Sequence, residues 1–122
     1  MNNKEQQDSN KIVYSDGITY VIKEDNTASV IHIDSTIDIF IPRSIKYETK
    51  EYIITSISQC SFQSCAVINS FQFAANSEVQ TIEKNAFQSM TIKNLSIPSK
   101  LTELKDGWLE GIFLIDKITV SP

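Results

Sequence analysis

The residues with the greatest chemical potential in this chain are two cysteines and one histidine. Cys60 and Cys65 lie five positions apart, and His32 is the single histidine. A cysteine nucleophile needs a base within hydrogen-bonding reach, and a third group usually orients that base. We expect His32 to lie in a separate N-terminal segment, far from the cysteines, and no motif supplies the third group. We therefore predict that the protein is not an enzyme and that Cys65 is a small core residue.

The spacing of the cysteines and acidic residues gives little support for a metal site or a disulfide framework. A structural zinc site takes four ligands, commonly from two closely spaced pairs, and this chain has no C-x-x-C pair. Two cysteines are too few for a disulfide framework. Two reduced, partly buried thiols are the main interpretation, and a local disulfide is the alternative. The acidic residues follow neither an EF-hand pattern nor a paired-carboxylate spacing, so we expect no cofactor and no metal.

The composition indicates one domain and excludes several classes of partner. The 122 residues are 41% hydrophobic and carry 11 basic and 15 acidic side chains, for a net charge of −4. Lys and Arg do not cluster, which argues against nucleic acid or an anionic membrane as the partner. No segment approaches the roughly 18 consecutive apolar residues of a membrane-spanning helix. Residues 1–11 are polar and lack the apolar core of a secretory signal, so we predict a disordered lead-in there.

An internal repeat dominates the rest of the chain. An apolar template with spacings of three, five and three residues occurs three times, at intervals of 25 and 22 positions. Its copies are Ile54, Ile57, Phe62 and Cys65; Val79, Ile82, Phe87 and Met90; and Leu101, Leu104, Leu109 and Ile112. A constant period of this length is typical of repeat proteins whose units stack on one another.

A second apolar template lies between the copies of the first. It comprises Ile68, Phe71 and Phe73; Ile92, Leu95 and Ile97; and Ile115, Ile118 and Val120. The last two positions of each copy alternate, as in a strand with one buried face. Stacking would place Phe71, Leu95 and Ile118 in one column. The short segments after the first-template isoleucines, such as residues 83–90, are predicted to form single turns that bury a second column, Phe62, Phe87 and Leu109.

These patterns predict a short, β-rich solenoid. Residues 54–122 would form about three coils, with short parallel strands and one-turn helical or 3-10 connections. Upstream, residues 17–34 alternate on both sides of a polar turn at residues 24–27, which favours a β-hairpin. A repeat array needs its open end covered. We therefore assign residues 12–53 to a β-rich N-terminal cap.

Several strings in the chain resemble a known family. They are "TSISQCSFQSC" (55–65), "TIEKNAFQSM" (81–90), "LSIP" (95–98), "LTEL" (101–104) and "IFIP" (39–42). They resemble the BspA-type leucine-rich repeats, with their I-x-I-P strands and I-x-x-x-A-F turns. The resemblance implies that the solenoid is right-handed and of the leucine-rich repeat type. It also implies a non-enzymatic surface or adhesin-like protein that binds a host, matrix or other cell-surface protein. Only the family resemblance implies localisation at the cell surface. A cytoplasmic location is the alternative, because the sequence shows no export signal.

The candidate binding residues lie between the apolar positions of the predicted strands. Alternation would turn Gln72, Ser96 and Thr119 outward, and three further polar side chains would flank them. The candidate site is Asn69, Gln72, Lys93, Ser96, Asp116 and Thr119. Exposed sheet faces of solenoids commonly bind partners. The alternative is a solvated polar ladder that serves solubility only.

The C-terminal end of the array suggests a rival function. Residues 115–120 form a last predicted strand with no coil after it, and an open strand edge invites pairing with another chain. The protein would then be a truncated or minimal structural repeat protein that lacks its own ligand and self-associates through this edge. Trp108 argues against further stacking, because it replaces the small residues Ser61 and Ala86 of the earlier copies.

Overall fold

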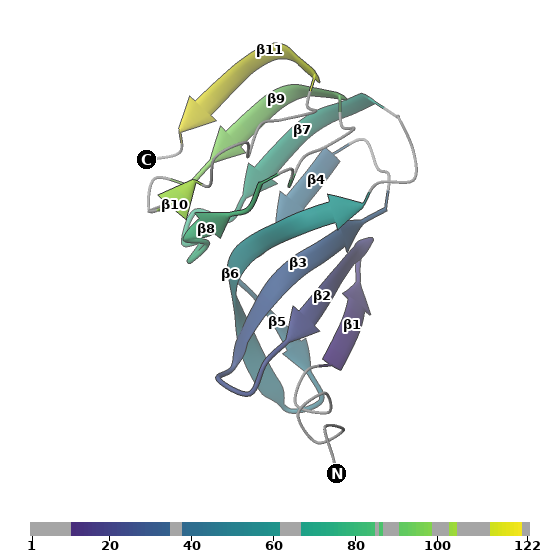
Figure 1. Cartoon of the computed structure of the whole chain (residues 1–122), viewed down its shortest axis with the longest axis vertical. Helices are drawn as coiled ribbons and strands as arrows, with labels where there is room; N and C mark the ends of the chain where they lie inside the picture. Colours follow the sequence, from purple (N-terminus) through teal and green to yellow (C-terminus); the bar gives the residue numbers. More distant parts are fainter. Residues whose placement is uncertain are drawn as a thin grey trace.

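The computed structural model shows a strand-rich chain arranged as two sheets that curl around a common core (Figure 1). It describes residues 11–34, 38–61, 67–84, 86, 91–98, 103–104 and 113–120. These residues form eleven strands. The same ranges contain no helix, and therefore none that could cross a membrane.

The N-terminal part is built from tight antiparallel hairpins. Strands β1 (Lys11–Ser15) and β2 (Ile18–Ile22) are joined by Asp16 and Gly17, whose φ angles of 51° and 81° are left-handed. An Asp-Gly pair with two left-handed residues suits the twist of a two-residue hairpin. Strand β3 (Thr27–Ile33) then pairs antiparallel with β2 across residues 23–26. The hairpin predicted over residues 17–34 is confirmed.

The seven-stranded sheet joins these hairpins to the first repeat template. Strand β3 pairs in parallel with β6 (Lys50–Ser61), which also forms an antiparallel hairpin with β5 (Ser44–Tyr47). Two short parallel strands, β8 (Thr81–Ile82) and β10 (Glu103–Leu104), continue the sheet. Ile57 lies opposite Ile82, and Ile82 opposite Leu104, so the template positions do align between repeats.

The four-stranded sheet carries the second template and consists entirely of parallel strands. Its order is β11 (Phe113–Val120), β9 (Thr91–Ile97), β7 (Val67–Phe73) and β4 (Asp38–Ile41). Phe71 lies opposite Leu95, which lies opposite Ile118, so the predicted column is confirmed. Ile39 of β4 lies opposite Phe71. The column therefore continues upstream of residue 54.

The last copy of the second template departs from the predicted alignment. Leu114, rather than Ile115, lies opposite Ile92, and the register shifts before Lys117 reaches Asn94. Such a shift accommodates one additional residue in β11, as a β-bulge does. The later positions, Ile118 and Val120, align as the repeat predicts.

Both sheets contribute to one apolar core. Ile54, Ile57, Val79 and Ile82 from the first template are fully buried, as is Phe71 from the second. Each buried side chain of this size contributes roughly 1.5–3 kcal/mol through removal from water. The predicted second column, Phe62, Phe87 and Leu109, lies outside the described residues.

The predicted one-turn helical connections are not confirmed. Within residues 83–90, the structure describes Glu83, Lys84 and Ala86, and the Ala86 amide donates a hydrogen bond to the Glu83 carbonyl at 3.2 Å. This bond spans three residues and closes a single turn. The described part of the connection is therefore a turn, and residues 85 and 87–90 lie outside the described residues.

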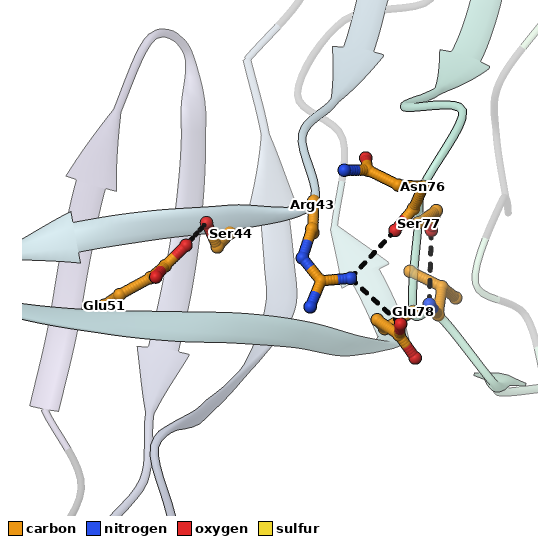
Figure 2. A network of polar contacts seen from close by, with 7 residues as sticks. Arg43, Ser44, Glu51, Asn76, Ser77 and Glu78 are labelled. Carbon is orange, nitrogen blue, oxygen red and sulfur yellow. Dashed lines mark hydrogen bonds and ion pairs between the residues drawn. The ribbon is translucent and has the colours of Figure 1, made fainter.

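A polar cluster fixes the corner where β4 leads into β5 (Figure 2). The Arg43 guanidinium donates to the Asn76 carbonyl at 3.1 Å and to Glu78 Oε2 at 2.9 Å. Both partners lie in the connection between β7 and β8. Because β7 is the strand beside β4, Arg43 holds the end of β4 in place against its neighbour.

Candidate recognition surface

A row of equivalent strand positions crosses the four-stranded sheet, in which Phe71 pairs with Leu95 directly before Gln72 and Ser96. Phe40 of β4 lies opposite Gln72 of β7, and Ser96 of β9 lies opposite Thr119 of β11. The Gln72 side chain is exposed and that of Ser96 is half-buried. Together with the flanking residues Asn69, Lys93 and Asp116, this row defines what we term the outer face.

The flanking residues also occupy neighbouring strands. Asn69 and Lys93 are exposed. Asp116 falls within the irregular part of β11, between Leu114 and Lys117. The structure describes the backbone of Asp116 and Thr119, and their side chains lie outside the description. The strand pairings thus bring the six candidate residues onto adjacent strands.

Phe40 is the residue of this face that sequence reasoning missed. Its side chain is 55% exposed, whereas its neighbours Ile39 and Ile41 are buried. Aromatic side chains, phenylalanine included, are enriched in protein interfaces relative to the rest of the protein surface. The signal was present in the sequence, because "IFIP" (39–42) matches "LSIP" (95–98) and places Phe40 at the position of Ser96.

Asp38 adds a negative charge beside Phe40. Asn69 Nδ2 and Ser70 Oγ both donate to Asp38 Oδ1, at 3.0 and 2.8 Å. These hydrogen bonds, that from Asn69 foremost, lower the pKa of the Asp38 carboxyl because they favour its ionised form. Asn94 Nδ2 in turn donates to the Asn69 carbonyl at 3.3 Å. A polar ladder therefore runs from β4 through β7 to β9.

One expectation about His32 is wrong. We expected this residue to lie far from the cysteine segment, but β3 and β6 are parallel neighbours and His32 lies opposite Ser61, next to Cys60. His32 lies close to Ser61 because neither β4 nor β5 is inserted between β3 and β6. Strand β4 belongs to the other sheet and β5 pairs with β6, so β3 and β6 can pair directly. His32 Nε2 contacts Asp34 Oδ1 at 3.3 Å, and Tyr14 donates to the other oxygen of Asp34 at 2.8 Å.

Solved structures of two bacterial proteins are similar to this chain, and the first agrees with its fold. A leucine-rich repeat protein from Bacteroides capillosus ATCC 29799 superimposes with a TM-score of 0.52 and 16% identity, over 91% of this chain and 99% of that one. A leucine-rich cell surface protein from Faecalibacterium prausnitzii A2-165 gives a TM-score of 0.44 and 14% identity, over 93% of this chain and 44% of that one. No curated protein matches.

The fold of this chain is therefore similar to that of a leucine-rich repeat protein. The sequence profile of the BspA type leucine rich repeat region matches residues 33–122, in six copies. The chain belongs to this family. The matched range begins at the end of β3 and so includes β4 and the β5–β6 hairpin as well as the later repeats. Membership suggests a role in protein interaction or adhesion.

Proposed function

We propose that the protein is a non-enzymatic recognition module that binds another protein through the outer face. The row formed by Phe40, Gln72 and Ser96 carries this proposal. It combines an exposed aromatic side chain with polar groups, which is the composition that specific protein interfaces favour. Burying Phe40 would supply apolar contact, and the polar positions would supply orientation.

We further propose that successive repeats stack as coils of a right-handed solenoid. Each repeat contributes one short strand to each sheet, as β7 and β8 do, and as β9 and β10 do again. The parallel pairings between repeats support this arrangement. Residues 12–53 would cap the N-terminal end, and residues 54–122 would present most of the binding face, which Phe40 of the cap extends. A host, matrix or cell-surface protein is the partner that the family suggests.

A charge-insertion variant tests the outer face. Gln72→Lys combined with Ser96→Lys should weaken binding of a partner captured from cell-surface extract by about tenfold or more, because two new cations disrupt the interface. The captured partner is then titrated against each variant by calorimetry. Thr49→Lys combined with Ala75→Lys is the matched control, since it adds the same charge at exposed turns. Equal affinity of the face variant and the control would reject the outer face.

Self-association through β11 is a second candidate function. Within the described residues, β11 pairs with β9 on one side and forms the edge of its sheet, and Ile118 is 39% exposed. An unprotected edge strand can pair with another chain. Light scattering over a range of concentrations should then reveal dimers, and Ile118→Lys should remove them. A monomer at every concentration would reject this candidate.

A further inference from the structure

An open groove adjoins the outer face at its N-terminal end. It has a volume of about 520 Å³ and lies where the β1–β2 hairpin meets β4 and β5. Its lining includes the buried side chains Ile18, Tyr20 and Ile45. Exposed residues in the same lining are Asp16, Asp38, Phe40 and Lys46. The groove therefore has apolar walls with charged groups at its opening.

The charges in this groove are unevenly distributed. A smaller hollow of about 60 Å³ adjoins it, and Asp16, Asp38 and Phe40 line both. Lys46 lines the larger groove alone. It lies opposite Glu51 in the β5–β6 pairing. Two carboxylates and one exposed aromatic ring thus share one end of the groove, and the cation belongs to the remainder.

The fold fixes the side chain of Asp38 and the backbone of Asp16. Asp38 accepts hydrogen bonds from Asn69 and Ser70, which favour its ionised state. Asp16 occupies the left-handed first position of the β1–β2 turn. Tyr20 remains neutral in the wall of the groove, because burial and the nearby Asp16 charge raise its pKa to about 12. The negative charge at this end therefore comes from the two carboxylates.

We infer that this end of the groove receives an arginine side chain of the protein partner. A guanidinium can stack on the face of an aromatic ring while its N–H groups donate to carboxylates, and Phe40, Asp16 and Asp38 offer both. This inference rests on the proposed function, because Phe40 belongs to the outer face as well as to the groove. A partner segment lying along the outer face could place an arginine in the groove.

The charges that line the groove favour an arginine over other side chains of a partner. An acidic segment would meet two carboxylates, which disfavours it. A neutral apolar side chain would fill the walls but would leave both carboxylates beside desolvated surface. A lysine would pair with the carboxylates but lacks the planar group that stacks on an aromatic ring and donates in parallel pairs.

Titration with small analogues tests the inference directly. The intact ¹⁵N-labelled protein is titrated with N-acetyl-arginine amide, and in parallel with the citrulline and lysine analogues. Citrulline keeps the planar shape of arginine but lacks its charge. We expect millimolar binding of the arginine analogue, with amide shifts at Asp16, Gly17, Asp38 and Phe40, and about tenfold weaker binding of the other two. Equal binding of either analogue, shifts confined to other regions, or no binding would overturn the assignment.

Two variants connect the response to the named side chains. Asp16→Asn keeps a residue that tolerates left-handed backbone and removes one charge, so arginine affinity should fall about threefold to tenfold. Phe40→Leu keeps an apolar side chain but removes the ring, and should lower affinity to a similar extent. Glu24→Gln is the matched control, because Glu24 is an exposed acid in the β2–β3 turn and lies outside the groove lining. Unchanged affinity in both groove variants would overturn the inference.

The outcomes for the groove and for the outer face are separable. Absence of arginine binding, together with partner binding that the Gln72→Lys and Ser96→Lys substitutions weaken, would reject the groove and leave the proposed function standing. Arginine binding without any effect of these substitutions on the partner would reject the outer face instead.

Discussion

The two ends of the four-stranded sheet differ in how they are held. At one end, β4 is four residues long, and Arg43 ties its exit to the connection between β7 and β8. At the other end, β11 is eight residues long and has a register shift in its middle. Both strands are edges of the sheet within the described residues, but β4 presents Phe40 beside a groove whereas β11 presents Ile118. The same parallel pairing thus leaves one edge strand tied down by Arg43 and the other with an irregular register. We propose recognition for the first edge and self-association for the second.

Truncation of a core residue on which both ends of the sheet depend should have the largest effect on the free energy of unfolding. Phe71 is fully buried and lies in the column between Ile39 and Leu95. Phe71→Ala should lower the free energy of unfolding by about 3–5 kcal/mol, through lost burial and the cavity left behind. Urea denaturation followed by circular dichroism measures this change. Phe40→Ala is the control, and a similar loss there would show that exposure does not separate the two residues.

Loss of the Arg43 contacts should weaken the β4 end selectively. Arg43→Ala removes the ion pair with Glu78 and the hydrogen bond to the Asn76 carbonyl. Because both ion-pair side chains are about one-third exposed, at 38% and 34%, we expect a cost of only about 1 kcal/mol. Amide hydrogen exchange should accelerate in β4 before it does in β9. Lys46→Ala removes an exposed cation from the adjacent strand as a control, and uniform acceleration in every strand would contradict the expected selectivity.

The smallest expected effect concerns the pH dependence of the β4 end. Hydrogen bonds from Asn69 and Ser70 lower the pKa of Asp38 in the folded state. The stabilisation from the ionised side chain is present above the ordinary carboxyl pKa of about 3.9, and it is lost as the pH falls through the lowered folded value. Asp38→Asn should therefore destabilise the protein at neutral pH, with a difference that shrinks on acidification. Urea midpoints measured across this acid range test the expectation, and a pH-independent difference would contradict it.

The sequence predicted those parts of the fold that repeat. Ile57 opposite Ile82, and Phe71 opposite Leu95, follow from the period alone, because equivalent residues of stacked units must meet. The β2–β3 hairpin was equally accessible, since its alternation and polar turn are local signals. Membership of the repeat family could also be inferred, from motifs of the later repeats.

The sequence did not predict features that depend on a local register shift or on a long-range strand pairing. The run Phe113, Leu114 and Ile115 offers adjacent apolar residues, and the register shift selects Leu114 to face Ile92. His32 lies opposite Ser61 through a long-range parallel pairing that no local pattern encodes. Phe40 escaped notice because its strand was grouped with the cap, although its position matches Ser96. The candidate site therefore lacked its aromatic residue until the strands were placed side by side.

The pairing of β4 with β7 has a consequence for synthesis on the ribosome. Strand β4 emerges at residues 38–41, but its neighbour in the sheet is made only at residues 67–73, after the β5–β6 hairpin. A nascent chain halted between these points lacks β7, so Ile39 and Ile41 would be less fully buried than in the completed chain. During synthesis, β4 therefore cannot pair until Phe71 and Phe73 of β7 have been made. Fragments stalled before that point should be the forms that chaperones bind and that aggregate most readily.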